Sequence, residues 1–430
     1  MKSAQSATLP GSAGSRFPRR YAVAGMFFLG TALCYIDRVS ISVAIIPLAH
    51  QYGYNSAAQG LVLSAFFWGY VWLQMGGGWM ADRFGGHRVL AAGVALWSIA
   101  TIMTPPAAAT SFAALLAARV ALGLGEGVNF PAVHSLTARW MPPSEHARVL
   151  ALNFSAMSLG TTVALALSPI IIAAFGWPAL FYISGGIGAL WVVAWWMTTA
   201  SRPEDSHRIS AAELEMIVAR RAAQPHAESV PWNAIVREKA VWAIVAAHFC
   251  SNFGFNILLL WMPTYLNHTF HVPLEHVGSY ALIPWIATFA TVNCAGWFSD
   301  WMRANGAGVG NLRKAMQGTA FALGAAPLIA LPLASSPGAA VAMLTISAAA
   351  NGIGLAAYGV NHLDVGPTYA GILMGISNSI ATLAGTIGVA AAGFIAQSTG
   401  SFSAVFRMIA AVYCAGMIVY IAWGSGERKL

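Results

Sequence analysis

Twelve stretches of mostly apolar residues constrain the fold of this chain more than any other feature. A helix needs about 20 such residues to cross the hydrocarbon core of a bilayer. Only 8% of the 430 residues are charged, whereas a water-soluble domain carries about 25%. The sequence therefore predicts an all-α membrane protein with twelve transmembrane helices. The predicted spans are residues 21–48, 57–81, 89–106, 111–137, 149–173, 178–199, 240–266, 276–299, 314–334, 338–360, 369–396 and 403–424.

A polar segment separates the sixth predicted span from the seventh. Residues 201–239 hold 12 of the 36 Asp, Glu, Lys and Arg residues of the chain. Within this segment, Ser210 followed by Glu213 has the spacing of a capping box and predicts a short surface helix. The predicted organisation is an N-terminal tail, a six-helix bundle, a central loop, a second six-helix bundle and a C-terminal tail, at residues 1–20, 21–200, 201–239, 240–424 and 425–430.

The basic residues predict the orientation of the chain. Of the 22 Lys and Arg residues, 19 fall on one side of the predicted membrane, and the other three, Arg38, Arg119 and Arg407, lie within spans. The positive-inside rule then places both termini and the central loop in the cytoplasm. The net charge of +8 is thus a topology signal, and we expect no nucleic-acid partner. The Ala-rich composition favours a bacterial inner membrane over a plastid.

The sequence shows no signature of an enzyme, a metal site or an ATP-driven pump. The four cysteines lie far apart in apolar runs, without the paired spacing of a zinc or redox site. The phosphate-binding pattern GxxxxGK does not occur. We therefore expect neither a metal nor an organic cofactor.

A repeated pattern indicates that the two halves are related. Gly78-Trp-Met-Ala-Asp82 ends span 2, and Gly296-Trp-Phe-Ser-Asp300 ends span 8 at the matching cytoplasmic position. Two chance matches are the alternative explanation. Duplicated halves predict a pseudo-symmetric transporter architecture with the substrate site at the interface between the repeats.

The segment that starts at Gly78 continues through Arg83, Gly85 and His87 to Arg88. It resembles the loop 2–3 signature of the major facilitator superfamily, with His87 where the family usually has a base. Gly78 allows close helix contact, and neighbouring charges can hold the halves together in one state and release them in the other. The residues expected to form this cytoplasmic gate are Gly78, Asp82, Arg83, Gly85, Arg88 and Asp300.

Four ionisable residues inside predicted spans are candidates for the transport site, because charges in a membrane are costly and usually functional. They are Asp37 and Arg38 in span 1, and Arg119 and Glu126 in span 4. The last two share a helix face because seven residues make about two turns. Protonating one carboxylate would leave net positive charge for an incoming anion. Alternatively, these residues form structural ion pairs, and Arg119 is the best candidate for that role.

Several motifs narrow the resemblance to the anion:cation symporter family. They include Tyr35-Ile-Asp-Arg38, the segment from Ser64 to Tyr70, and the Gly-Leu-Gly-Glu-Gly that contains Glu126. Leu260-Trp-Met-Pro-Thr-Tyr265 and the segment from Asn361 to Asn378 are similar to the sialin and vesicular glutamate transporter group. They are also similar to the plant plastid phosphate/anion transporters.

The resemblance implies roles for individual residues. Arg38 is the expected ligand of the anion, Asp37 and Glu126 are the expected proton-coupling groups, and Arg119 is their expected charge partner. Three polar residues stand where relatives contact the substrate, namely Tyr35, Tyr70 and Asn378. His134 and His248 also lie within spans, either as packed histidines or as proton carriers.

Together these features predict a major facilitator fold that acts by alternating access. We expect proton-coupled symport of a small organic anion, a carboxylate such as a sugar acid, with Na⁺ as the other candidate coupling ion. The alternatives are a sodium- or proton-coupled inorganic phosphate transporter and a non-transporting membrane nutrient receptor. The expected partners are the anionic solute and the lipid bilayer, and the expected oligomeric state is a monomer.

Overall fold

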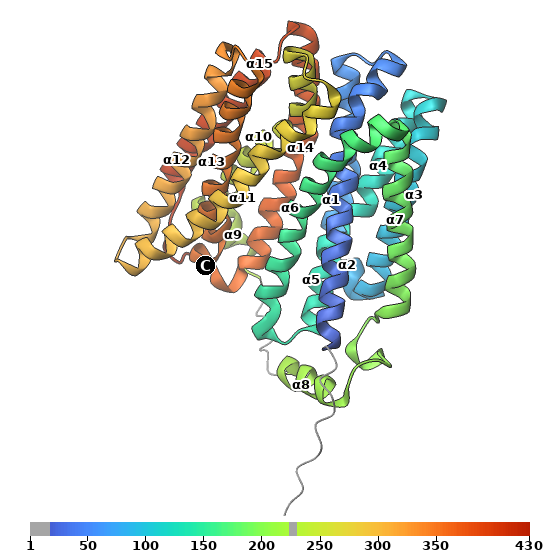
Figure 1. Ribbon diagram of the computed structural model, residues 1–430. Helices are drawn as coiled ribbons and strands as arrows, with labels where there is room; N and C mark the ends of the chain where they lie inside the picture. Colours follow the sequence, from blue (N-terminus) through green and yellow to red (C-terminus); the bar gives the residue numbers. More distant parts are fainter. Residues whose placement is uncertain (1–17, 223–229) are drawn as a thin grey trace, which may run out of the picture.

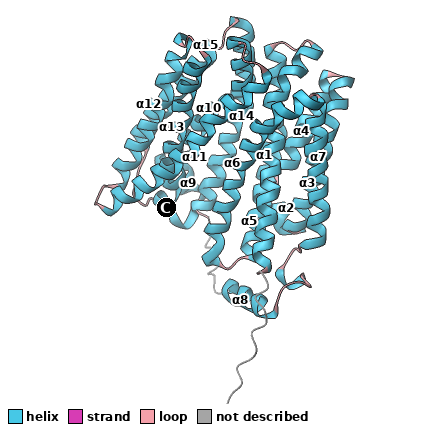
Figure 2. Cartoon of the chain, viewed as in Figure 1, coloured by secondary structure: helices cyan, strands magenta, loops and turns pink. Residues whose placement is uncertain are grey.

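The structure, a computed structural model, describes residues 18–222 and 230–430. Within these ranges every regular element is a helix (Figures 1 and 2). Twelve helical segments in this part of the chain are long and apolar enough to cross a membrane. The predicted all-α architecture with twelve spans is therefore confirmed.

The helices form two groups that stand side by side in Figure 1. Members of each group pack mainly on one another. The first group consists of α1 (Arg19–Tyr52), α2 (Ser56–Phe84), α3 (Gly86–Thr110), α4 (Phe112–Gly127), α5 (Asn129–Trp140), α6 (Pro143–Phe175) and α7 (Trp177–Thr198). The second consists of α10 (Lys239–Phe270), α11 (Leu274–Ala304), α12 (Val309–Ala330), η2 (Leu331–Leu333), α13 (Pro337–Val365), η3 (Pro367–Tyr369), α14 (Ala370–Thr399) and α15 (Ser403–Trp423).

The fourth span is divided into two helices, although the sequence predicted one continuous helix over residues 111–137. The break lies at Val128, between α4 and α5. Its cause is local: Pro131 has no N–H to donate to the carbonyl of Gly127, four residues earlier. The two pieces still form one membrane span.

The two groups meet at the end of the molecule opposite the central loop. A Cβ atom built on Gly60 of α2 would lie 3.0 Å from the Cα atom of Gly393 of α14. At the same end the Ser56 N–H donates to Gln397 Oε1 at 3.1 Å. Helices α6 and α11 also pack closely there, since a Cβ on Gly278 would lie 2.2 Å from the Leu165 carbonyl oxygen. The interface is therefore closed at this end.

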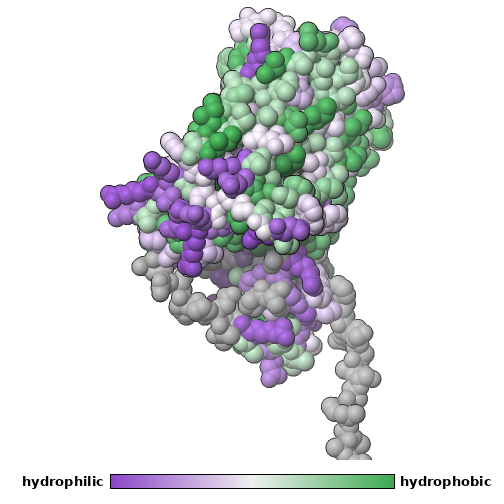
Figure 3. Space-filling view, turned by 90° about the vertical axis from the view of Figure 1, so that its left-hand side faces the viewer, coloured by the Kyte–Doolittle hydropathy of each residue, from purple (hydrophilic) through white to green (hydrophobic). Residues whose placement is uncertain are grey.

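The surface has the distribution expected of a membrane protein. On the face shown in Figure 3, hydrophobic residues cover most of the upper body, and hydrophilic residues gather toward the lower end, where the central loop lies. Large apolar side chains, including Trp72, Leu190 and Trp297, are exposed on the helices. Such a surface requires lipid rather than water around it.

The central loop contains the short helix that the sequence predicted. Its elements are η1 (Pro203–Asp205), α8 (Ala211–Ala222) and α9 (Trp232–Arg237). Helix α8 starts directly after Ser210, whose Oγ accepts a hydrogen bond from the Glu213 N–H at 3.3 Å. This is the capping contact that the Ser–Glu spacing predicted.

The Glu213 carboxylate binds the start of α1 instead of reaching back to its own cap residue. Its two oxygens accept the backbone N–H groups of Arg19 and Arg20 at 2.9 and 3.1 Å. Arg20 Nη1 also donates to Glu213 Oε1 at 3.0 Å. A carboxylate at a helix N-terminus is favoured by the unpaired N–H groups and by the helix dipole. Glu213 therefore fixes the central-loop helix to α1.

Arg20 extends this network to α6. Its Nε donates to Glu145 Oε2 at 2.9 Å, and the Tyr21 hydroxyl donates to Glu145 Oε1 at 3.1 Å. Partial burial raises the pKa of Glu145, but the hydrogen bonds from Arg20 and Tyr21 outweigh burial and leave that pKa below its ordinary value. The carboxylate is therefore ionised at neutral pH, and α8, α1 and α6 are joined at one end of the bundle.

We expect Glu213→Gln to lower the free energy of unfolding by about 1–2 kcal/mol, because hydrogen bonds to a charged acceptor are lost. Thermal unfolding in detergent measures this as a lower midpoint temperature. Glu215→Gln is the matched control, since Glu215 lies on the same helix and is exposed. Equal midpoints for the two variants would contradict a stabilising role of Glu213.

Candidate functional site

An arginine–glutamate ion pair lies in the interior of the first helix group. Arg38 of α1 donates from Nε and Nη2 to the same oxygen of Glu126 on α4, Oε2, at 3.1 and 2.9 Å. The Glu126 side chain is fully buried, and only 10% of the Arg38 side chain is exposed. A paired guanidinium is far less costly in a low-dielectric interior than an unpaired one. The structure thus brings together the predicted anion ligand and a predicted proton-coupling group.

Three aromatic rings surround the Arg38 guanidinium. Its central carbon lies 4.6 Å from the centroid of Tyr35, 4.5 Å from that of Phe66 and 4.7 Å from that of Tyr70. Arg38 Nη1 also donates to the Tyr35 hydroxyl at 3.4 Å. Each ring face attracts a cation, and the attraction is strongest where water is absent. We call Tyr35, Phe66 and Tyr70 the ring cage.

The cage combines predicted and unpredicted residues. Tyr35 and Tyr70 were expected at the site, whereas Phe66 was not singled out in the sequence. The sequence feature that could have indicated Phe66 is its four-residue spacing to Tyr70, which places both rings on one face of α2. Helix spacing alone could not show that this face points at Arg38.

A thiol is a further unpredicted member of the site. Cys34 Sγ donates to Glu126 Oε2 at 3.1 Å, and Arg38 Nη2 lies 3.7 Å from the same sulfur atom. Oε2 therefore accepts three donors, while Oε1 has no hydrogen-bond partner among the described residues. The Glu126 carboxylate is held through one oxygen only.

The structure does not confirm the expected partner of Arg119. Both Arg119 on α4 and Asp37 on α1 are buried. Within the described residues, Arg119 Nε and Nη1 and both Asp37 oxygens lack hydrogen-bond partners. Arg119 lies near enough to Asp37 and Glu126 for charge attraction, but Glu126 is bound by Arg38 instead. The role of Arg119 as a charge partner of these carboxylates therefore stays a prediction.

Arg119 nevertheless belongs to the same cluster. Its guanidinium carbon lies 6.0 Å from the centroid of the Phe66 ring, which also contacts Arg38. The Asp37 carboxyl lies near Ser184 of α7. The interior of the first helix group thus holds two cations and two acidic groups, and the described residues show one ion pair between them.

Asn378 lies away from this cluster in the present conformation. It is half-buried on α14, in the second helix group. One turn further along α14, the Thr382 hydroxyl donates to Gln74 Oε1 of α2 at 2.8 Å. The two helices are antiparallel, so Tyr70 and Asn378 lie on opposite sides of that contact. The structure does not bring Asn378 to the ring cage.

The residues predicted to form a gate are not engaged across the interface here. Arg83, Arg88 and Asp300 are exposed, and a Cβ built on Gly78 would meet no atom within 4 Å. The close helix contact expected at Gly78 is therefore absent from the described structure. The side chain of Asp82 lies outside the described residues.

Gly85 has a local structural role. It lies between α2 and α3 with a φ of 90°, a backbone conformation that favours glycine. Arg83 places its guanidinium 5.9 Å from the ring centroid of Trp79, one turn earlier on α2. These residues shape the turn between the two helices.

The second helix group has its own charge cluster, at the end where α12 begins and α13 ends. Arg313 of α12 donates to Asp364 Oδ2 of α13 at 2.8 Å and to Ser299 Oγ of α11 at 2.9 Å. Both charged side chains are almost fully buried. This cluster joins three helices of one group.

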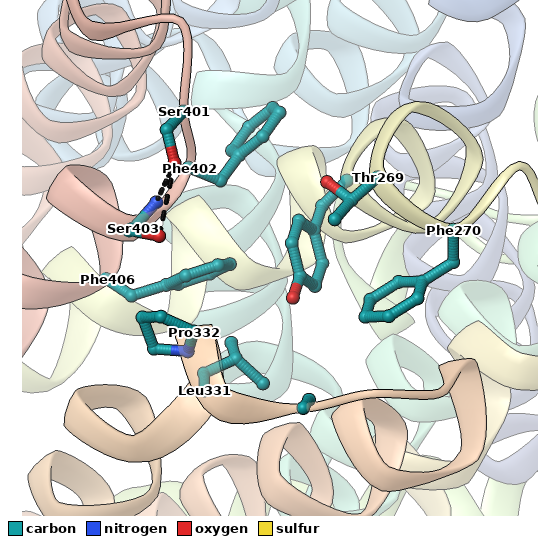
Figure 4. Close-up of a pocket in the computed structure, with 10 residues that line it drawn as sticks. Thr269, Phe270, Leu331, Pro332, Ser401, Phe402, Ser403 and Phe406 are labelled. Atoms are coloured by element: carbon teal, nitrogen blue, oxygen red, sulfur yellow. Dashed lines mark hydrogen bonds between the residues drawn. The ribbon is translucent and has the colours of Figure 1, made fainter.

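One small cavity lies apart from the predicted site. A cavity of about 90 Å³ near the end opposite α8 is lined by residues of α10, η2 and α15 and of the turns beside them. Phe402, Phe406 and Phe270 surround it (Figure 4). None of the predicted site residues lines this cavity.

Comparison with known proteins gives consistent matches over most of the chain. Residues 27–389 match the Major Facilitator Superfamily. The chain is 40% identical over 415 residues to the ascorbate transporter, chloroplastic, of Arabidopsis thaliana, covering 96% of this chain and 76% of the relative. It is 39% identical over 412 residues to the sodium-dependent phosphate transport protein 1, chloroplastic, of the same species, covering 96% and 80%. A probable anion transporter 4, chloroplastic, of Oryza sativa subsp. japonica is 39% identical over 415 residues, covering 96% and 70%.

Solved structures show the same fold at low sequence identity. A D-xylose-proton symporter superposes with a TM-score of 0.74 at 13% identity, covering 95% of this chain and 99% of the other. A bacterial homolog of the human lysosomal transporter Spinster gives a TM-score of 0.72 at 18% identity, covering 95% and 96%. These likenesses concern the arrangement of the helices.

We expect Gly123→Ala to destabilise the protein strongly, because α2 and α4 are in backbone contact at this point. A Cβ on Gly123 would lie 1.9 Å from the Phe66 carbonyl oxygen. Overpacking of this kind costs about 1–3 kcal/mol, and thermal unfolding in detergent measures it. Gly76→Ala is the control, since a Cβ there would meet no atom within 4 Å. Similar midpoints for both variants would refute the close contact.

Proposed function

Because the chain belongs to the Major Facilitator Superfamily, we propose that it is a secondary transporter that carries a small anion across the membrane by alternating access of its two helix groups. One observation supports the anion above all: the buried Arg38 guanidinium is held by Glu126 on one side and by the ring cage around it. A buried guanidinium of this kind suits a transporter that binds negative charge. The relatives named above are anion, ascorbate and phosphate transporters.

Inorganic phosphate is the first candidate substrate. The sequence pointed mainly to a carboxylate such as a sugar acid, but the similarity to a sodium-dependent phosphate transport protein covers 96% of this chain. The similarity to an ascorbate transporter has the same extent and makes an organic anion the second candidate. Sodium and protons are both candidate coupling ions.

In the proposed cycle, the anion replaces Glu126 as the partner of Arg38. A proton that binds the Glu126 carboxylate removes its negative charge, and the ion pair then loses most of its stabilisation. Arg38 Nε and Nη2 become free to donate to two oxygens of an oxyanion, for which a guanidinium is well shaped. The ring cage keeps the guanidinium in place while its partner changes.

Asp37 is the second candidate proton carrier. An ionised carboxylate is costly in an apolar interior when neither a cation nor a hydrogen-bond donor holds it. Since both Asp37 oxygens lack a hydrogen-bond partner among the described residues and Arg119 is near but forms no ion pair with them, we assign the protonated form to this state. Arg119, which has no ion-pair partner in the described structure, is available as a second cation for an anion with two charges.

We place the α8 end of the molecule on the inner side of the membrane, following the distribution of basic residues. The chain is a multi-pass membrane protein with twelve candidate spans. The relatives named above are chloroplastic proteins and give no support to the expected bacterial inner membrane. Since a single chain contains the whole charged cluster, we propose that it works as a monomer.

Uptake into proteoliposomes tests the function and separates the substrates. We expect accumulation of labelled phosphate when an inward gradient of sodium or protons is imposed, and less accumulation of ascorbate. Replacing sodium with choline at constant pH distinguishes the two coupling ions. Absence of uptake for phosphate, ascorbate and sugar acids under both gradients would contradict the proposed function.

Variants of the ion pair test its role. Arg38→Lys keeps the charge but loses the two-pronged geometry of the guanidinium. We therefore expect the half-saturation concentration of the transported anion to rise about 10- to 100-fold. Glu126→Gln should retain exchange of the anion and lose gradient-driven accumulation if protons are the coupling ion. The control is Arg407→Lys, because Arg407 is exposed on α15. Unchanged half-saturation in Arg38→Lys would remove this residue from the anion site.

A further inference from the structure

Two buried imidazoles in the second helix group share one serine hydroxyl. His248 Nδ1 of α10 lies 3.1 Å from Ser377 Oγ of α14, and His362 Nε2 of α13 lies 2.9 Å from the same oxygen. All three side chains are buried, with 4%, 0% and 2% exposure for His248, Ser377 and His362. The cluster joins three helices and is separate from the Arg38–Glu126 pair.

The partners of His362 determine where its proton lies. His362 Nδ1 is 3.2 Å from the carbonyl oxygen of Gly359, which can only accept a hydrogen bond. Nδ1 must therefore carry a proton. In a neutral imidazole the other nitrogen, Nε2, is then an acceptor, and it receives the hydroxyl proton of Ser377. Ser377 Oγ in turn accepts Nδ1–H of His248.

The same atoms also accommodate a second proton on His362. The Ser377 hydroxyl has another acceptor in reach, the Met374 carbonyl oxygen at 3.1 Å. When a proton binds His362 Nε2, the hydroxyl proton turns from Nε2 to that carbonyl, and Oγ accepts Nε2–H. Every donor is then paired in both states. The serine thus acts as a switch that fits either protonation state of the imidazole.

His362 lies close to the inner end of its helix. It stands three residues before Val365, the last residue of α13, which corresponds to about 5 Å of helical rise. Ser377 and His248 lie seven and nine residues from the inner ends of α14 and α10, about 10 and 13 Å from those ends. The cluster therefore extends from near the inner surface toward the middle of the membrane.

Few charged groups face this cluster. From α13, the Tyr358 ring packs on His248 with a centroid distance of 5.0 Å. From α12, Arg313 is held by Asp364 at 2.8 Å, and α14 carries no charged residue. Among the described residues no carboxylate or cation is bonded to either imidazole. The protonation state thus depends on the hydroxyl network and on access of protons from the inner side.

We propose that His362 is a further proton-binding site, in addition to Glu126 and Asp37, and that it lies in the helix group that lacks the anion site. Ser377 is its switch, and His248 holds the serine in place. One proton from the inner compartment adds to Nε2, and no other bond is formed or broken except the hydrogen bond that the hydroxyl redirects. This inference rests on the proposed transport function for its effect on coupling.

Protonation of this site would act on the interface between the helix groups through α14. Ser377 precedes Asn378, and one turn beyond it Thr382 bonds to Gln74 of α2 across the interface. A change at the serine is therefore transmitted along one rigid helix to a contact between the groups. This gives the second helix group a way to respond to the pH of the inner side.

The first test is independent of transport. Nuclear magnetic resonance of ¹⁵N-histidine-labelled protein reports which ring nitrogen carries a proton. We expect His362 to be the Nδ1–H form at high pH and to gain a proton at Nε2 on acidification. Ser377→Ala should abolish that transition, and Ser377→Thr, which keeps a hydroxyl, should restore it. A His362 ring protonated only at Nε2, or a titration unchanged in Ser377→Ala, would overturn the proposal.

The second test uses uptake of labelled phosphate, or of whichever anion the wild-type protein carries. In His362→Gln we expect pH-gradient-driven accumulation to fall at least 10-fold, while exchange of internal for external anion stays within 2-fold of wild type. A structural role alone would lower both rates together. His50→Gln is the control, since His50 is exposed near the end of α1. Wild-type accumulation in His362→Gln would refute the coupling role, whereas absence of transport in wild-type protein would refute the proposed function instead.

Discussion

The whole arrangement of the first helix group depends on keeping one guanidinium inside the lipid barrier. Arg38 has a fixed positive charge, and a carboxylate and three aromatic rings stabilise it. Both kinds of partner require α1, α2 and α4 to approach closely. Gly123 makes this approach feasible, because any side chain there would collide with the backbone at Phe66. The glycine at position 123 thus allows the helix packing that brings the partners of Arg38 together.

The two helix groups differ in where their charged side chains lie. The first holds the membrane-embedded residues Asp37, Arg38, Arg119 and Glu126, whereas the interior of the second presents neutral donors and acceptors, such as the His–Ser–His cluster. The second group confines its ion pair, Arg313 with Asp364, to one end. In the proposed cycle the first group binds the anion and the second adjusts its position to the proton supply. In this proposal the two helix groups therefore have different roles.

The sequence predicted the parts of the fold that depend on hydrophobic length. The twelve spans and the start of α8 after Ser210 were predicted because lipid thickness and helix capping act locally. The break at Val128 could also be inferred from Pro131 in retrospect. Which side chains of different helices bind each other could not be predicted in the same way. The seven-residue spacing of Arg119 and Glu126 placed them on one face, but it could not show that Arg38 of another helix would bind that carboxylate first.

The ring cage and the position of Asn378 also depend on contacts between helices that the sequence alone could not predict. Phe66 looked like any apolar residue of a span, since its role depends on the rotation of α2 relative to α1. Asn378 was selected by resemblance, yet the antiparallel register of α2 and α14 keeps it apart from Tyr70 in this conformation. Alternating access changes such registers by moving the two groups relative to each other. A residue of the second group therefore meets the anion site in only part of the cycle, whereas Arg38, Glu126 and the ring cage, which lie within one group, stay together throughout. For this reason the proposed anion site and its proton carriers, Glu126 and Asp37, are placed in the first group, and the second group adds a further proton site.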